Sequence, residues 1–265
     1  RESLKRYLSE HVEGWSGENP LEVSQFPTGF SNLTYLVKCG EQEAVLRRPP
    51  FGPLPPKAHD MKREFQLLRK LHPYYPYLPE PYAFCEDERV IGARFYLMER
   101  KKGIVLDDGF PLESELTVER CERISHVVVD ALAELHQINY KEAGLADFGY
   151  PQGFLERQVN GWIKRYDRSK TDDIPVVDRI AKWLVEHIPT PHEATVIHND
   201  YKLNNMLFSS DLNQIEAILD WEMATIADPL FDLAGALGYW VVEGDSDLLM
   251  DAGISTLTAN PGFIS

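Results

Sequence analysis

Long apolar runs and paired cysteines are the features that this sequence lacks. No apolar run approaches the ~18 residues that a membrane-spanning helix requires. The three cysteines, Cys39, Cys85 and Cys121, are odd in number, widely spaced and without a C-x-x-C pair, so the sequence indicates neither a disulfide framework nor a zinc site. We therefore expect a cytoplasmic protein without a membrane partner.

Positive charge is also in short supply. The 27 lysine and arginine residues are outnumbered by 42 aspartate and glutamate residues, which gives a net charge of −15 at pH 7. This balance argues against a nucleic-acid backbone or an anionic membrane as the main partner. The apolar fraction of 43% is typical of a folded protein. We expect a small molecule as the partner, and the sequence does not indicate an oligomeric state.

The N-terminal part of the chain has the pattern of a small antiparallel sheet. Short segments rich in Val, Leu, Tyr and Thr predict strands at 21–27, 33–39, 43–48, 81–86 and 89–98. Apolar residues spaced by three and four predict helices at 3–15 and 61–71. Polar residues and a glycine at 99–107 predict a connector between two lobes.

The remainder of the chain has mainly helical patterns. Helices are predicted at 121–140, 154–167 and 175–188, and two short apolar runs at 206–208 and 215–219 predict a hairpin. The fold class is therefore α+β. We expect an N-lobe over 1–98 with one main helix, a linker over 99–107 and a larger, mostly helical C-lobe over 108–265.

One polar loop carries the groups that phosphoryl transfer needs. Residues 196–205 read VIHNDYKLNN and contain the pattern H-x-D-x-x-x-x-N. In phosphoryl transfer a carboxylate accepts the proton of the attacking hydroxyl and an amide oxygen helps to hold magnesium, and Asp200 and Asn205 supply these groups. Asp220, at the end of the hairpin, is the candidate second metal ligand. Lys202 is the candidate cation over the transferring phosphoryl group. The alternative is that these polar side chains only cap turns.

These residues, in their order, resemble the aminoglycoside phosphotransferase and choline kinase superfamily, which shares the bilobal fold of the protein kinases. Within it, the chain is similar to the branch whose kinase-like domain is fused to acyl-CoA dehydrogenases. The segments that carry the resemblance are 26–35, 45–50, 58–64, 95–99, 135–136, 196–205, 219–222 and 228–233. The resemblance implies that the helical lobe continues past residue 265.

The resemblance implies a nucleotide site between the lobes that takes ATP or GTP with Mg²⁺. It implies that Asp200 is the base and that Asn205 and Asp220 are the metal ligands. The implied nucleotide-binding residues are Gly29, Ser31, Asn32, Val45, Arg47, Glu64, Met98 and Glu99. Arg47 stands where kinases have a lysine, with Glu64 as its partner; Arg48 is the alternative for this role.

Several other positions have roles that the resemblance helps to assign. Asp228-Pro229 predicts a helix start, and the family pattern implies that Asp232, one turn later, buttresses the catalytic loop. Asn199 stands where relatives commonly have glycine, and asparagine tolerates the same left-handed backbone. The triplet Asp147-Phe148-Gly149 matches the metal motif of protein kinases but precedes Asp200, so we interpret it as a turn.

The sequence leaves the activity and the acceptor open. The expected activity is transfer of a γ-phosphoryl group to a hydroxyl of a small molecule, and the alternatives are a nucleotide-binding pseudokinase and a protein kinase. The acceptor is either an aminoglycoside or choline-like amino alcohol, or a hydroxyacyl-CoA. Basic residues outnumber acidic ones over 156–170; a solvated helix face explains them, and an anionic acceptor is the alternative.

Overall fold

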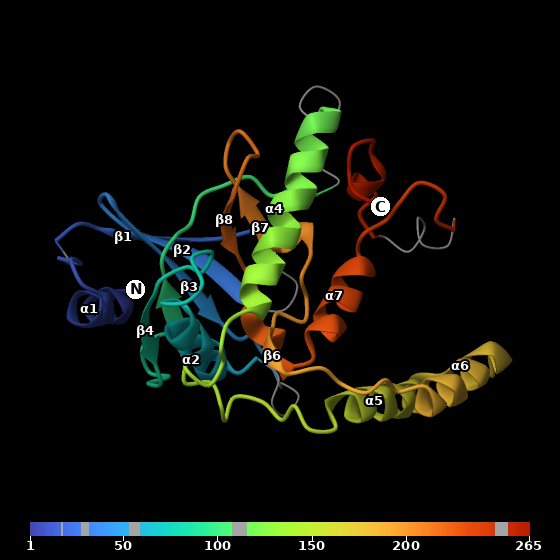
Figure 1. Ribbon diagram of the computed structural model, residues 1–265. Helices are drawn as coiled ribbons and strands as arrows, with labels where there is room; N and C mark the ends of the chain where they lie inside the picture. The colour runs from blue at the N-terminus through green and yellow to red at the C-terminus, as the bar shows by residue number, and fades with distance from the viewer. Residues whose placement is uncertain (17, 28–31, 53–58, 108–115, 247–253) are drawn as a thin grey trace.

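The computed structural model describes the chain except for residues 17, 28–31, 53–58, 108–115 and 247–253. Figure 1 shows a sheet-rich lobe formed by the N-terminal part of the chain and a helical lobe arranged around the long helix α4. Gly29 and Ser31, two of the expected nucleotide-binding residues, lie outside the described residues. No helix among the residues that are described is long and apolar enough to cross a membrane.

The N-lobe is a five-stranded antiparallel sheet with the strand order β1-β2-β3-β5-β4. The strands are β1 (Leu21–Gln25), β2 (Leu33–Cys39), β3 (Gln42–Arg48), β4 (Pro81–Cys85) and β5 (Phe95–Met98). Helices α1 (Glu2–His11) and α2 (Met61–Leu71) cover opposite faces, because alternate strand residues enter two different cores. Ala44 and Leu46 pack with α1, whereas Val45 packs with α2.

The strand expected at 89–98 is shorter in the structure, and that prediction is wrong for residues 89–94. These residues form a turn instead. The Asp87 carboxylate accepts hydrogen bonds from the backbone N–H and the guanidinium of Arg89, and Gly92 has a φ of 81°. A local polar turn with a left-handed residue therefore replaces the first half of the expected strand.

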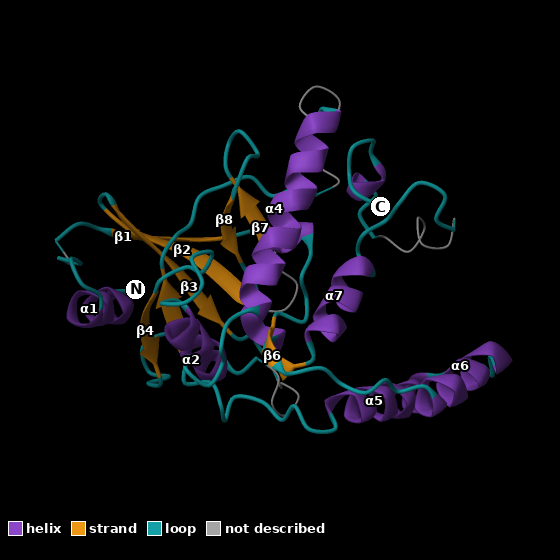
Figure 2. Cartoon of the chain, in the orientation of Figure 1, coloured by secondary structure: helices purple, strands orange, loops and turns teal. Residues whose placement is uncertain are grey.

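In the described part of the C-lobe there are four longer helices and two small antiparallel sheets (Figure 2). The helices are α4 (Val118–His136), α5 (Phe154–Ser169), α6 (Pro175–Glu186) and α7 (Pro229–Leu237). Strands β7 (Met206–Phe208) and β8 (Ile215–Ile218) form the expected hairpin, and β6 (Thr195–Ile197) pairs with β9 (Thr225–Ala227). The pairing of β6 with β9 brings the segments before and after the hairpin together. The loop after β6, which carries Asp200, and the loop before β9, which carries Asp220, therefore lie next to each other.

The two lobes are joined by contacts of α2 with C-lobe loops. Arg63 of α2 donates hydrogen bonds to the carbonyl oxygens of Phe148 and Ala224, and its guanidinium lies over the Phe148 ring at 4.0 Å. Residues 147 and 148 form a turn and a bend, as expected for the triplet that resembles a kinase metal motif. Gly149 follows, and a Cβ atom there would lie 2.8 Å from the backbone nitrogen of Ile226. This triplet therefore packs between α2, which contacts Phe148, and β9, which contacts Gly149.

Candidate active site

The candidate catalytic loop, residues 198–205, begins where β6 ends, and one buried carboxylate holds its first residues. Asp232, in the first turn of α7, accepts hydrogen bonds from the backbone N–H groups of His198, at 2.8 Å, and Asn199, at 2.7 Å. Asn199 has a φ of 68°, the left-handed backbone expected for this position. Asp228 caps the helix through the N–H of Leu230. The start of α7 therefore fixes the path of the backbone that leads to Asp200.

His198 connects this loop with the loop that carries Asp220. Its Nδ1 accepts the backbone N–H of Asp200 at 3.2 Å, and its Nε2 donates to the carbonyl oxygen of Leu219 at 2.9 Å. Both bonds together require the neutral imidazole with the proton on Nε2. Burial lowers the pKa of His198, although the negative charge of Asp232 opposes this shift. The residue is thus a neutral bridge between the two loops.

Asp200 is surrounded by the two side chains that the sequence predicts for it. Its Oδ2 atom accepts a hydrogen bond from Nδ2 of Asn205 at 2.9 Å and lies 3.1 Å from Nζ of Lys202. Because the Asn205 amide uses its nitrogen for Asp200, its oxygen remains available for a cation. A carboxylate held in this way has a fixed direction for accepting a proton.

Arg47 is the centre of a buried ionic cluster between the lobes. The cluster consists of Arg47 on β3, Glu64 on α2, and Asp220 and Glu222 from the loop after β8. Arg47 Nη1 lies 3.4 Å from Glu64, and Nη2 donates a hydrogen bond to Asp220 and lies 3.7 Å from Glu222. Asp220 itself has a φ of 65°. The expected pair of Arg47 and Glu64 is present, and Arg47 in addition reaches across to the candidate metal ligand.

The charges in this cluster do not balance. One guanidinium faces three carboxylates, and the Glu64 side chain is only 2% exposed. Burial raises the pKa of Glu64 to about 7, because Arg47 shares its charge with Asp220 and only partly offsets the desolvation. The neighbouring carboxylates raise the pKa of Arg47 despite its burial. The Nε atom of Arg47 and the Oε2 atom of Glu64 are buried and have no hydrogen-bond partner in the part of the chain that the structure describes. The excess of negative charge favours a cationic ligand.

Asn32 lies at the edge of the same cluster. Its Nδ2 donates a hydrogen bond to Glu222 at 2.6 Å, and its Oδ1 lies 2.9 Å from Nδ1 of His59. Asn32 was expected near the nucleotide, whereas the sequence analysis assigned no role to Glu222 or His59. The only signal for Glu222 is the D-x-E spacing after β8. Arg48, the alternative to Arg47, is instead stacked on Phe51 at 4.1 Å.

The residues expected around the nucleotide base lie on two neighbouring strands. Val45 on β3 is directly opposite Met98 on β5, and both are buried. Glu99 follows β5; its backbone N–H donates to Glu80, and its carboxylate accepts the N–H of Glu80. Val45 and Met98 belong to the same core as α2, so the packing alone also explains their burial.

The donors present fit a magnesium ion that is shared with a nucleotide. Among the described residues, no group of three or more His, Cys, Asp or Glu side chains is arranged to hold a metal alone. Mg²⁺ is usually bound by one or two carboxylates together with substrate phosphates and water. The Asp220 carboxylate and the Asn205 amide oxygen supply such a partial set of hard oxygen ligands.

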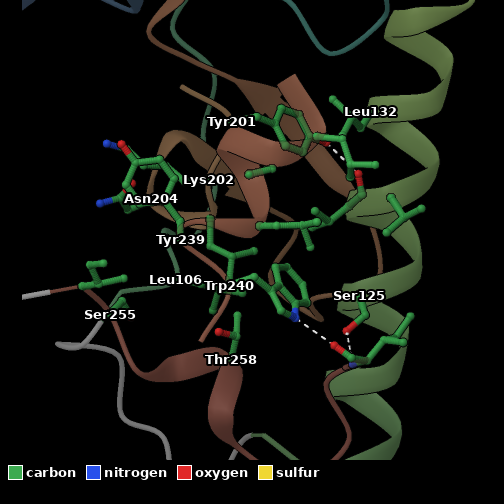
Figure 3. A pocket seen from close by; sticks show the side chains of 18 of the residues that line it. Leu106, Ser125, Leu132, Tyr201, Lys202, Asn204, Tyr239, Trp240, Ser255 and Thr258 are labelled. Carbon is green, nitrogen blue, oxygen red and sulfur yellow. Dashed lines mark hydrogen bonds between the residues drawn. The ribbon is translucent and has the colours of Figure 1, made fainter. Parts of the chain in front are cut away.

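A cavity of about 370 Å³ opens beside the catalytic loop, between α4 and the segment after α7 (Figure 3). Most of its lining is apolar, from Leu106, Val128, Leu132, Leu233, Leu237 and Trp240. Lys202, Asn204 and Tyr239 lie at one end. Among the described lining residues, Lys202 is the only one with a charged side chain, and none comes from α5. The basic segment 156–170 is therefore not part of this cavity. Tyr239 was not among the predicted site residues.

Comparisons with known proteins show what this chain is similar to. Residues 22–262 match the phosphotransferase enzyme family. The chain is 36% identical over 235 residues to acyl-CoA dehydrogenase family member 11 from Homo sapiens; this match covers 88% of the chain but only 30% of that protein. The chain thus spans less than a third of this relative.

The solved structures that are similar to this chain include phosphotransferases. A protein from Ralstonia eutropha, provisionally described as an aminoglycoside phosphotransferase, has a TM-score of 0.81 and 31% identity, and the match covers 100% of this chain and 76% of that one. An aminoglycoside phosphotransferase in a ternary complex with streptomycin and ATP has a TM-score of 0.58 at 21% identity, covering 87% and 73%, and shows the fold alone.

Proposed function

This chain belongs to the phosphotransferase enzyme family, and from that premise we propose that it transfers the γ-phosphoryl group of ATP, with Mg²⁺, to a hydroxyl of a small molecule. The observation that carries the proposal is the arrangement around Asp200. Its carboxylate is oriented by Asn205 and lies 3.1 Å from the ammonium of Lys202, and the Lys202 side chain lines the polar end of the cavity. A hydroxyl compound bound there would meet a base and a cation at the same point.

The proposed roles follow from the contacts of each residue. Asp200 accepts the proton of the acceptor hydroxyl as its oxygen bonds to the γ-phosphorus, and the bond from phosphorus to the β–γ bridging oxygen breaks so that ADP leaves. Lys202 stabilises negative charge on the transferring group. Arg47 contacts the α- and β-phosphates in place of the usual lysine. Asp220 and Asn205 hold Mg²⁺, which neutralises phosphate charge when bound.

The cavity supports an acceptor with an apolar body. An aminoglycoside carries several positive charges and needs carboxylates, whereas no acidic side chain lies among the described lining residues. The apolar lining instead suits a chain of methylene groups, with the reacting hydroxyl at the end where Lys202 lies. A hydroxyacyl thioester has this chemistry. The name of the human relative, an acyl-CoA dehydrogenase family member, supports the same class.

Thermal unfolding with nucleotides provides the first test. We expect ATP to raise the melting temperature in the presence of Mg²⁺ and to have a smaller effect without Mg²⁺. The reason is that a ligand that binds the native state but not the unfolded state stabilises the native state. GTP serves as the comparison. If neither nucleotide gives a magnesium-dependent shift, the proposed function is wrong.

An acceptor screen with labelled ATP distinguishes a kinase from a pseudokinase. The panel contains hydroxyacyl-CoA esters of several chain lengths, free hydroxy acids, an aminoglycoside and choline. We expect transfer to hydroxyacyl compounds, and Asp200→Asn should abolish this transfer while leaving the magnesium-dependent stabilisation by ATP intact. Nucleotide binding without transfer to any acceptor would favour the pseudokinase, and transfer to the aminoglycoside alone would contradict the proposed acceptor class.

A further inference from the structure

Tyr239 lies at the polar end of the cavity, two residues after the end of α7. The Nζ atom of Lys202 is 4.9 Å from the centre of the Tyr239 ring and 3.1 Å from Oδ2 of Asp200. The ammonium group is therefore held between a carboxylate and an aromatic face. Figure 3 shows Tyr239 and Lys202 at the same end of the cavity, beside Asn204.

We propose that Tyr239 is a positioning residue that holds Lys202 ready for phosphoryl transfer. This inference rests on the proposed function. An ammonium group bound only to Asp200 would occupy the carboxylate that must accept the proton of the acceptor. The ring of Tyr239 offers the same ammonium a second, uncharged site, since a cation is attracted to the face of an aromatic ring. Lys202 can then move from Asp200 toward the phosphoryl oxygens while its ammonium group stays in contact with the Tyr239 ring.

The surroundings of Asp200 make the second site important. Its Oδ2 atom already accepts a hydrogen bond from Asn205, so Lys202 competes for an oxygen that is in use. Tyr239 also interacts with both members of this pair: burial, the negative charge of Asp200 and a side-chain hydrogen bond to Asp200 raise the pKa of the Tyr239 hydroxyl, whereas the positive charge of Lys202 lowers it. The ring, the ammonium and the carboxylate therefore form one interacting group, and the sequence motif predicts two of its members, Lys202 and Asp200.

Steady-state kinetics on three variants and their combination test the inference. Tyr239→Leu removes the ring but keeps an apolar side chain, Tyr239→Phe keeps the ring, and Lys202→Met removes the cation. Loss of a cation–π contact should lower kcat by roughly 2- to 30-fold in Tyr239→Leu, with little change in KM for ATP. Tyr239→Phe, which keeps the ring, should retain most of the wild-type kcat. Tyr150→Leu, at a tyrosine that is 81% exposed, is the matched control.

The double variant shows whether Tyr239 acts through Lys202. If it does, Tyr239→Leu should cause no further loss of kcat in the Lys202→Met background. Additive losses, an unchanged kcat in Tyr239→Leu, or a change confined to KM for the acceptor would overturn the inference and leave the proposed kinase activity standing. A wild-type chain that transfers no phosphoryl group would overturn both together.

Discussion

Arg47 of the N-lobe donates a hydrogen bond to the carboxylate of Asp220 in the C-lobe, so one ion pair spans the boundary between the lobes. Replacing Arg47 by methionine should destabilise the chain by about 3–5 kcal/mol, because buried Glu64 would lose the cation with which it is paired. Chemical denaturation measures this change. Arg89→Met, in an exposed pair with Asp87, is the control and should leave stability almost unchanged, because exposed ion pairs contribute little. Equal effects of the two variants would contradict the prediction.

Asp232→Asn should weaken the catalytic loop. The carboxylate accepts two backbone N–H groups, whereas an amide offers one oxygen and turns its NH₂ group toward the other donor. We expect a loss of about 1–3 kcal/mol in the free energy of unfolding and a lower kcat with little change in nucleotide affinity. Asp211→Asn, in an exposed turn, should leave turnover unchanged. Wild-type turnover in Asp232→Asn would show that the loop keeps its path without this carboxylate.

Two glycine substitutions should have opposite signs. Gly149→Ala places a Cβ atom 2.8 Å from the backbone of Ile226, which cannot yield as a flexible side chain would, and we expect a loss of about 1–3 kcal/mol. Gly235→Ala, inside α7, meets nothing within 4 Å and should stabilise the helix by about 0.5–1 kcal/mol. Melting curves of both variants measure the difference. A stable Gly149→Ala variant would mean that the turn at Gly149 and strand β9 can move apart to make room for the methyl group.

His198 should make stability depend on pH. Because burial lowers its pKa in the folded state below the ordinary value of 6.5, the unfolded chain binds the extra proton first as the pH falls. The contribution of His198 is therefore complete above about pH 6.5 and is lost as the pH falls through the folded-state pKa, by at most about 1.4 kcal/mol per pH unit.

Denaturation of wild type and His198→Asn between pH 5 and 8 checks this sign. We expect a steeper loss of stability toward acid in the wild type, since the variant lacks the group that must stay neutral to accept the N–H of Asp200. Glu64, whose raised pKa acts in the opposite direction, is common to both proteins and cancels in the difference. Parallel curves would exclude His198 as the source.

The sequence predicts local patterns well and long-range contacts only in part. The strand at 33–39 and the hairpin after the catalytic loop are confirmed, because their apolar runs and turn residues determine them locally. Strand β9 was not predicted, since its three residues form a strand only by pairing with β6. The start of β5 was wrong because the side chain of Asp87 builds a turn there.

The same distinction applies to the site. A spaced motif identifies Asp200 and Asn205, and the structure brings them together. Glu222 and Tyr239 reach the site only through folding: one joins the cluster around Arg47 and the other follows α7 to the ammonium of Lys202. The D-x-E spacing is only a weak signal for Glu222, and Tyr239 has none, because acidic and aromatic residues are common elsewhere in the chain.

The hydrogen bonds from Arg63 to the carbonyl oxygens of Phe148 and Ala224 fix the position of α2 against the C-lobe. In protein kinases the matching helix swings to switch the enzyme on or off, and the Lys–Glu ion pair forms only in the active position. Here α2 is anchored to the C-lobe, and Glu64 already faces Arg47. A swing of α2 away from this position would therefore break both hydrogen bonds of Arg63 as well as the pair of Glu64 with Arg47.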